Sequence, residues 1–144
     1  MPGQASLAAR QYYAHPRNQF WLIMGTLFGF AANASYELRV RALTDAHIAL
    51  WDVLRSCTRS GSLDTAIVDE KPNDIPDFLR RHPNIRIVFL NGSKAEACYR
   101  RHVQTRIDRP VSCLRLPSTS PAHASRSFAE KLAAWQAVKK AVRE

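Results

Sequence analysis

The sequence has few cysteines and few glycines, and both shortages exclude kinds of functional site. Its three cysteines, Cys57, Cys98 and Cys113, lie far apart, with no Cys-x-x-Cys pair. A zinc site, an iron–sulfur cluster and a disulfide framework are therefore not expected, and a reducing cytoplasm fits best. The five glycines form neither a phosphate-binding P-loop nor a dinucleotide fingerprint, and no Ser-His-Asp arrangement stands in a recognisable context. We expect no metal and no cofactor.

No stretch of the chain is apolar enough for a membrane span. Residues 18–36 carry no charge, but polar and small side chains interrupt them more than a run of about 20 apolar residues would allow. The interrupting residues are Asn18, Gln19, Gly25, Thr26, Gly29, Asn33 and Ser35. We therefore predict a buried helix in this region. The chain opens without a positively charged leader and an apolar stretch behind it, so no secretory signal is expected.

What the chain does have is the composition of one globular domain with a strong positive charge. Its 144 residues are 46% apolar and 23% charged, so we predict a single domain over residues 1–144. The formal net charge of +9 and the isoelectric point near 10.1 favour a polyanion as partner, with nucleic acid as the leading candidate. Charge alone gives no specificity, so a merely basic globular protein stays open as an alternative.

Hydrophobic periodicity and turn residues predict helices that alternate with strands. Helices are expected over residues 19–30, 35–46, 73–81 and 93–103, near 63–68, and from 127 onward. Strands are expected at Ile48–Leu54, Ile85–Leu90 and Val111–Leu116. Two of the helices start with the capping-box patterns Ser93-x-x-Glu96 and Ser127-x-x-Glu130.

This alternation predicts an α/β fold, with three layers (α/β/α) and a short, mostly parallel central sheet. In such sheets ligands collect at the carboxyl ends of strands. Asn91 follows one predicted strand, and Ser118 to Ser120 follow another. Asn18 lies just ahead of the first predicted helix. The similar placement of these polar residues predicts a shared site.

The segment Gln11–Trp21, QYYAHPRNQFW, is the most informative stretch of the chain. Aromatic faces can sandwich a flat heterocycle, and amides can read its edge or hold a water molecule against it, as in proteins that extract a nucleobase from a duplex. A loop of aromatic residues ahead of a helix could instead be packing alone.

Five segments, in consistent order, carry a resemblance that spans nearly the whole chain. They are MPGQASL, QYYAHPRNQFW, IALWDVL, FLNGSKAE and LPSTSPAHASRSFAEKLAAW. In these segments the chain resembles the uracil-DNA glycosylase superfamily, and within it the hypoxanthine-DNA (deoxyinosine) glycosylase branch, which is related to the mismatch-specific uracil-DNA glycosylases. The resemblance implies a monomeric, monofunctional DNA repair glycosylase without a cofactor. It would flip a deaminated base, hypoxanthine or uracil, out of double-stranded DNA and hydrolyse its N-glycosidic bond to leave an abasic site.

The resemblance also implies roles for residues near the start of the chain. Asn18 is the implied catalytic residue that holds the attacking water, because Met1 stands where many relatives have Asp or Asn. Tyr13 would stack on the extruded base, with His15 and Gly3 also at the base pocket. Asn18 could instead only cap the following helix, and Tyr13 could be a core residue.

Two later segments receive implied roles as well. Asn91 stands where several relatives read the base, and Ser118, Thr119, Ser120 and His123 belong to a loop that grips DNA phosphates. Asn91 could instead only stabilise its turn, and the hydroxyls could only satisfy turn backbone. His123 stands where many relatives have Asn.

One departure from the family concerns the start of the chain. The family places the central strand of its sheet before the Pro-Gly turn, and here the chain starts at that turn. We therefore expect a fold that lacks the family's first strand, in a chain truncated at its amino end. A catalytically inactive, DNA-binding remnant of the same fold is the alternative. An unrelated α/β hydrolase is a third reading, without a visible nucleophile and base to support it.

Overall fold

The computed structural model describes residues 12–13, 17–58, 68–121 and 125–143. The chain divides into two compact units. The first spans Asp52–Leu116, and the second combines the segments on either side, up to Trp51 and from Pro117. The predicted site residues are therefore distributed over both units.

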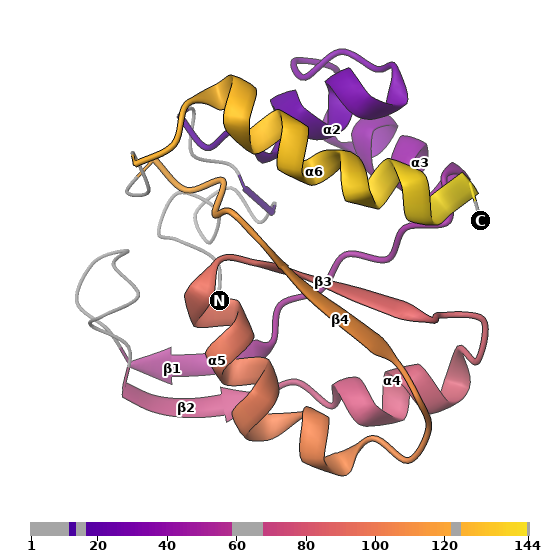
Figure 1. The fold of residues 1–144 in the computed structure, drawn as a ribbon, viewed down its shortest axis with the longest axis vertical. Helices are drawn as coiled ribbons and strands as arrows, with labels where there is room; N and C mark the ends of the chain where they lie inside the picture. Colours follow the sequence, from indigo (N-terminus) through magenta and orange to yellow (C-terminus); the bar gives the residue numbers. More distant parts are fainter. Residues whose placement is uncertain (1–11, 14–16, 59–67, 122–124, 144) are drawn as a thin grey trace. The chain divides into compact units, whose positions relative to one another are not determined.

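The first unit is built on a parallel pair of strands (Figure 1). β3 (Ile87–Asn91) and β4 (Ser112–Leu116) pair along their whole length. The helix α5 (Ser93–His102) and the 3-10 helix η2 (Gln104–Arg106) lie in the crossover that joins them, as a parallel pair requires. Both strands were predicted to within two residues. Helices together with a parallel pair make this an α/β protein, which confirms the predicted fold class.

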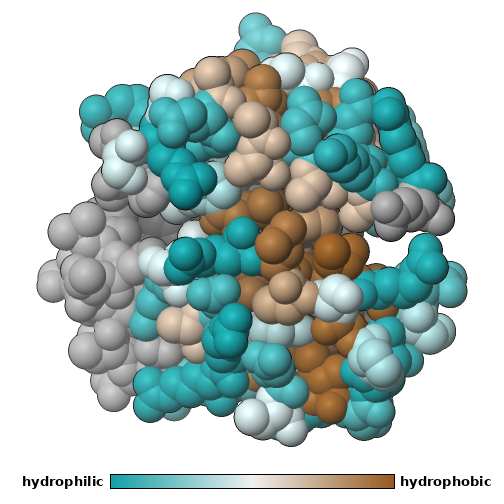
Figure 2. Space-filling model, viewed as in Figure 1, coloured by the Kyte–Doolittle hydropathy of each residue, from teal (hydrophilic) through white to brown (hydrophobic). Residues whose placement is uncertain are grey.

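The core of this unit lies on one face of the parallel pair. Its buried residues are Ile75, Leu79, Leu90, Tyr99 and Val103. Val88 and Cys113, which are paired in the sheet, pack against this core. Neighbouring strand residues point to opposite faces, so Leu114 points away from the core. It is 43% exposed. Figure 2 shows apolar surface in the region where Figure 1 draws β3 and β4.

The other pair of strands in this unit is antiparallel, which the sequence did not lead us to expect. β1 (Leu54–Thr58) pairs with β2 (Val68–Pro72). Only residues 59–67 connect them, and a connection this short cannot make the crossover that a parallel pair needs. The short helix predicted near residues 63–68 falls mainly outside the described residues, and Val68 belongs to a strand.

The strand predicted at Ile48–Leu54 is wrong, because only its last residue lies in a strand. Asn73 terminates the hairpin at this point. Its backbone N–H donates to the carbonyl of Val53 at 2.8 Å, and its side-chain amide donates to the carbonyl of Asp52 at 2.7 Å. Pro72 has no N–H with which to extend the ladder. The preceding residues therefore form a loop despite their β-prone composition.

Two predicted helix starts in this unit have different outcomes. The sequence offers Asn73 or Asp74 as the N-cap of α4 (Ile75–Arg81), and Asp74 takes that position, since its Oδ1 accepts the N–H of Asp77 at 3.2 Å. The capping box of α5 is wrong, because Gly92 takes the N-cap position and no side chain caps the helix. Gly92 has φ 94°, which favours glycine, and its N–H donates to the carbonyl of Leu116 at 3.0 Å. Backbone geometry, rather than a side chain, sets the start of α5.

The second unit contains three α-helices among its described residues. They are α2 (Phe20–Phe28), α3 (Tyr36–Asp45) and α6 (Phe128–Arg143). All three were predicted from the sequence. α2 packs against both α3 and α6. Its buried face contributes Ile23, Met24 and Leu27 to the core of the unit, so α2 is the central helix of this part of the protein.

Side-chain caps begin two of these helices. The hydroxyl of Ser35 accepts the N–H of Leu38 at 3.3 Å at the start of α3. At the start of α6 the N–H of Glu130 donates to Ser127 Oγ at 3.2 Å, and the N–H of Ser127 donates to Glu130 Oε1 at 3.3 Å. This reciprocal pair confirms the second predicted capping box.

Candidate functional site

The start of α2 is joined to the loop that follows β4 by a backbone hydrogen bond. The N–H of Gln19 donates to the carbonyl of Thr119 at 3.0 Å. A second bond fixes the same loop to α6, because Trp135 Nε1 donates to the carbonyl of Pro117 at 2.9 Å. Two carbonyls of the loop are thus held by two helical segments. Asn18, which directly precedes Gln19, is held beside this loop as a result.

The side chain of Asn18 is oriented by the helix that follows it. Its Oδ1 accepts the N–H of Phe20 at 3.0 Å, and an N–H requires an oxygen, which assigns the two ends of the amide. A carbonyl oxygen has a second lone pair, and the Nδ2 group has two hydrogens to donate. The half-buried amide can therefore accept the N–H of Phe20 and still hold a water molecule or a base edge.

Tyr13 is stacked on the first residue of α2. Its ring centroid lies 4.1 Å from that of Phe20, with 24° between the planes. Phe20 in turn makes edge contacts with Trp21 at 4.9 Å and Trp135 at 5.8 Å. Tyr13 also has φ 54°, in the left-handed region that large side chains rarely adopt. Such strain persists where the surroundings impose it, and it clusters at binding sites.

The three hydroxyl residues after β4 differ in exposure. Thr119 is 0% exposed, so its hydroxyl does not reach the surface in this structure. Ser118 Oγ accepts the N–H of Ser120 at 3.1 Å, which makes a serine turn. Both serines are half-buried. Thr119 therefore holds the loop in place, while the two serines are the residues of the three that can meet a ligand.

Asn91 lies in the first unit, at the carboxyl end of β3. It is half-buried and pairs with Leu116, the last residue of β4. Gly92 then turns the chain into α5. The carboxyl ends of two parallel strands thus lie together here, which is where α/β proteins bind their ligands. The second unit brings Asn18, Tyr13 and the loop after β4 together, and the first unit presents Asn91.

Three predicted site residues, Gly3, His15 and His123, lie outside the described residues. Met1 does too. The roles that the sequence suggested for them stay predictions.

The sequence analysis missed two residues that hold site segments in place. It assigned no role to Trp135 or to Tyr36. In the structure Trp135 Nε1 donates to Pro117, and the hydroxyl of Tyr36 accepts the N–H of Tyr12 at 3.3 Å. A buried indole N–H or phenol O–H generally needs a hydrogen-bond partner. This rule could have indicated polar roles for Trp135 and Tyr36 from the sequence.

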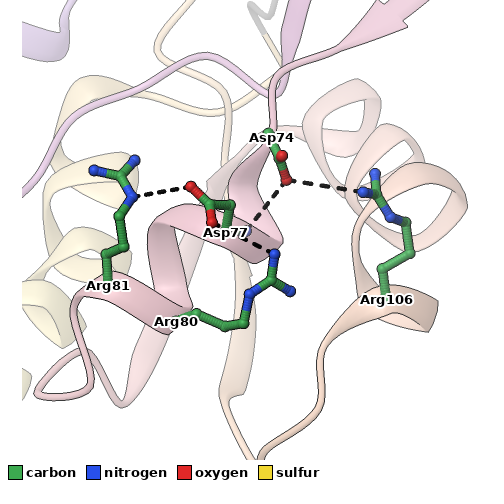
Figure 3. Close-up of polar contacts among 5 residues, drawn as sticks. All are labelled: Asp74, Asp77, Arg80, Arg81 and Arg106. Carbon is green, nitrogen blue, oxygen red and sulfur yellow. Dashed lines mark hydrogen bonds and ion pairs between the residues drawn. The ribbon is translucent and has the colours of Figure 1, made fainter.

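Several arginines of the first unit are paired with carboxylates. The pairs are Arg80–Asp77 (3.5 Å), Arg81–Asp77 (2.9 Å), Arg106–Asp74 (3.8 Å), Arg100–Glu96 (3.5 Å) and Arg115–Glu96 (3.5 Å). Figure 3 shows the first three around α4. Each of these arginines is largely exposed, so one pair contributes about 0–1 kcal/mol of stability. Their main effect is to neutralise part of the positive charge of this unit.

Lys131 on α6 differs from the exposed cations. The residue is 2% exposed, and this burial lowers the pKa of its ammonium group. It therefore contributes less to the charged surface than Lys140 on the same helix, which is exposed.

Comparison with known proteins identifies the family. No family model matches the chain. Over 96 residues, 66% of its length, the chain is 38% identical to a protein of Methanosarcina barkeri and 35% identical to one of Methanosarcina acetivorans, each named hypoxanthine DNA glycosylase. The chain spans 61% of the length of each of these curated relatives. The solution NMR structure of "a putative Uracil DNA glycosylase" from Methanosarcina acetivorans matches with a TM-score of 0.81 and 30% identity, over 99% of this chain and 86% of that one.

The chain belongs to the uracil-DNA glycosylase superfamily, and the curated relatives that it matches over 61% of their length are named hypoxanthine DNA glycosylases. The resemblance found in the sequence motifs is thereby confirmed. Among the residues that the structure describes, this glycosylase relative has no helix long and apolar enough to cross a membrane. Neutral groups lie around the start of α2: an amide, hydroxyls, backbone N–H and carbonyl groups, and aromatic rings.

Proposed function

We propose that this protein is a monofunctional DNA glycosylase that removes a deaminated base, hypoxanthine or uracil, from double-stranded DNA, with hypoxanthine as the preferred base. The observation that carries the proposal is the hydrogen bond between Gln19 and Thr119, which holds Asn18 beside the loop after β4. The identity to relatives named hypoxanthine DNA glycosylase supports hypoxanthine as the base. The net charge of +9 supports a polyanionic substrate.

The proposed reaction is a hydrolysis, and the neutral groups of this site are suited to it. The oxygen of a water molecule bonds to C1′ of the sugar, and the bond from C1′ to the base nitrogen breaks. The electron pair of that bond stays on the base, which finally takes up a proton from the water. Donors placed where negative charge grows on the leaving base stabilise the transition state without a strong acid.

In this proposal Asn18 holds the water through the second lone pair of Oδ1, while the Phe20 N–H fixes the amide. Tyr13 stacks on the flipped base, with His15 and Gly3 at the same pocket. Asn91 pairs with the amide-like edge of hypoxanthine, an edge that adenine lacks. Adenine would leave a buried amide without a partner, which is the kind of penalty that gives strong discrimination.

Ser118 and Ser120 contact DNA phosphates in the proposal, together with His123. Thr119 acts indirectly, because its side chain is buried and its carbonyl holds the start of α2. The protein acts as a monomer on the duplex.

The test of the activity uses three duplexes, each with a single deoxyinosine, uracil or xanthine. Incubation with the protein should create alkali-labile strand breaks, most rapidly at deoxyinosine. Salt-sensitive binding to all three duplexes without any base release would contradict the proposal and would favour the non-catalytic DNA-binding alternative.

The catalytic role is tested by Asn18→Ala. We expect base release to fall on the order of 100- to 1000-fold, as when a single positioned transition-state group is lost. Binding of the duplex should be nearly unchanged, and loss of the hydrogen bond from the Phe20 N–H should lower stability by about 1 kcal/mol. Asn18→Asp is the matched control for this hydrogen bond, since its carboxylate still accepts the Phe20 N–H. A near-normal rate in Asn18→Ala would place catalysis elsewhere.

A further inference from the structure

Both backbone polar groups of Tyr12 are held by aromatic side chains from two helices. Its N–H donates to the hydroxyl of Tyr36 on α3 at 3.3 Å, and its carbonyl accepts from Trp21 Nε1 on α2 at 2.9 Å. These two rings also meet edge to face, with centroids 6.0 Å apart. The peptide groups on both sides of Tyr12 are therefore fixed by a pair of rings that contact each other.

Arg39 covers this pair of rings. The carbon at the centre of its guanidinium lies 4.8 Å from the centroid of Trp21 and 5.5 Å from that of Tyr36. Its Nε is buried without a hydrogen-bond partner in the described part of the chain. A buried donor on a permanent cation is costly unless the surroundings compensate, and two aromatic faces offer such compensation through cation–π attraction. Arg39 thus holds the two rings together, and none of the ion pairs among the described residues includes it.

The residue that follows this attachment is Tyr13. Its φ of 54° turns its ring onto Phe20, where the two stack at 4.1 Å. A tyrosine does not prefer this backbone conformation, so neighbouring interactions must impose it. The described interactions that fix the backbone immediately before Tyr13 are the two bonds to Tyr12.

We propose that Trp21, Tyr36 and Arg39 form a clamp that positions Tyr13 for stacking on the flipped base. The three are positioning residues, since they act through the backbone of Tyr12. The inference rests on the proposed function, because it assumes that a base is flipped onto Tyr13. It adds the prediction that residues of α3, a helix to which the sequence gave no role, control how well the base is held.

The decisive variant is Tyr36→Phe, which keeps the ring and removes only the hydroxyl. With one hydrogen bond lost, the single-turnover rate of base release at saturating duplex should fall about fivefold. Affinity for undamaged duplex should not change, because that binding precedes base flipping. The fluorescence of 2-aminopurine placed next to the deoxyinosine, which rises as the base leaves the stack, should fall in parallel with the rate.

Thr44→Val is the matched control on the same helix. It removes a hydroxyl that donates to the carbonyl of Val40 at 3.0 Å, at an exposed position away from the clamp. Its rate and its fluorescence should equal those of the wild type. Equal values in Tyr36→Phe and Thr44→Val would overturn the proposal.

The Arg39 part of the clamp is tested with two variants. Arg39→Met removes the cation and keeps most of the volume, and it should lower the rate about threefold, while Arg39→Lys should recover part of that loss. A rate in Arg39→Met equal to that of the wild type would remove Arg39 from the clamp.

Failure of the proposed function can be told apart from failure of the clamp. If the wild type releases no base, the proposed function is wrong. The clamp is then decided by the exchange rate of the Tyr12 amide hydrogen, measured by NMR in the wild type and in Tyr36→Phe. Faster exchange in the variant supports the clamp, and equal exchange contradicts it.

Discussion

The two units hold their polar residues in place by different means. In the second unit, hydrogen bonds join segments that are far apart in the chain, as between Gln19 and Thr119 or between Trp135 and Pro117. In the first unit, Asn91 is presented by its own strand, directly after the core residue Leu90. A change in the first unit should therefore be seen mainly as a loss of stability, and one in the second mainly as a loss of activity.

The arginine side chains of the two units also differ in the groups that they contact. Several arginines of the first unit pair with carboxylates, as Arg81 does with Asp77. Arg39 of the second unit lies over aromatic rings instead. The first arrangement balances charge at the surface, whereas the second fixes the geometry of a backbone segment.

The largest effect on stability is expected from Leu90→Ala in the first unit. Leu90 is 3% exposed in the core, and removing its side chain should lower the free energy of unfolding by about 2–5 kcal/mol. Urea denaturation followed by circular dichroism measures this change. Leu114→Ala, at a 43% exposed position in the neighbouring strand, is the control and should cost far less. Equal losses in the two variants would contradict the assignment of the core to one face of the sheet.

A smaller effect on stability, with a clear effect on activity, is expected from Trp135→Phe in the second unit. The variant keeps an aromatic ring but leaves the carbonyl of Pro117 without its donor, at a cost of about 1–3 kcal/mol. The loop after β4 should then be placed less well, and base release should fall about tenfold or more. Gln136→Ala, the exposed neighbour on α6, should change neither quantity. A stability loss with unchanged activity would show that the two units do not differ in the proposed way.

The smallest effect at neutral pH is expected from Tyr99→Phe in the first unit. The Tyr99 hydroxyl is buried and has no hydrogen-bond partner among the described residues, so its removal should leave stability unchanged or raise it by about 1 kcal/mol. Burial, with a smaller contribution from Cys113, raises the pKa of Tyr99 to about 12.

The raised pKa of Tyr99 gives this variant a pH signature. The unfolded chain releases the phenol proton near its ordinary pKa of about 10, while the folded protein keeps it up to about 12, so wild-type stability should fall as pH rises between these values. Tyr99→Phe lacks this titration, and its advantage over the wild type should grow by about 2 kcal/mol at the upper end. Unfolding curves at pH 9 and pH 11 measure the difference. Parallel pH dependence in the two proteins would contradict it.

Much of the local structure was predictable because local interactions set it. The capping box of Ser127 and Glu130 starts α6 by bonds within four residues, and the sequence pattern alone reveals it. The capping box predicted at Ser93 and Glu96 is not formed, because the backbone conformation of Gly92 sets the start of α5 instead. The strand predicted from Ile48 failed because a strand needs a partner, and the partner strand ends at Pro72.

The sequence by itself determined the α/β class, most helix and strand positions and, through its motifs, the superfamily and the segment that carries Asn18 and Tyr13. The tertiary structure alone decided which polar groups meet. Gln19 reaches Thr119, the rings of Trp21 and Tyr36 reach Tyr12, and Thr119 is buried while its serine neighbours are not. Periodicity and capping depend on residues within a turn or two, so a sequence pattern records them. A hydrogen bond between distant segments depends on how the whole unit packs, and no local pattern contains it.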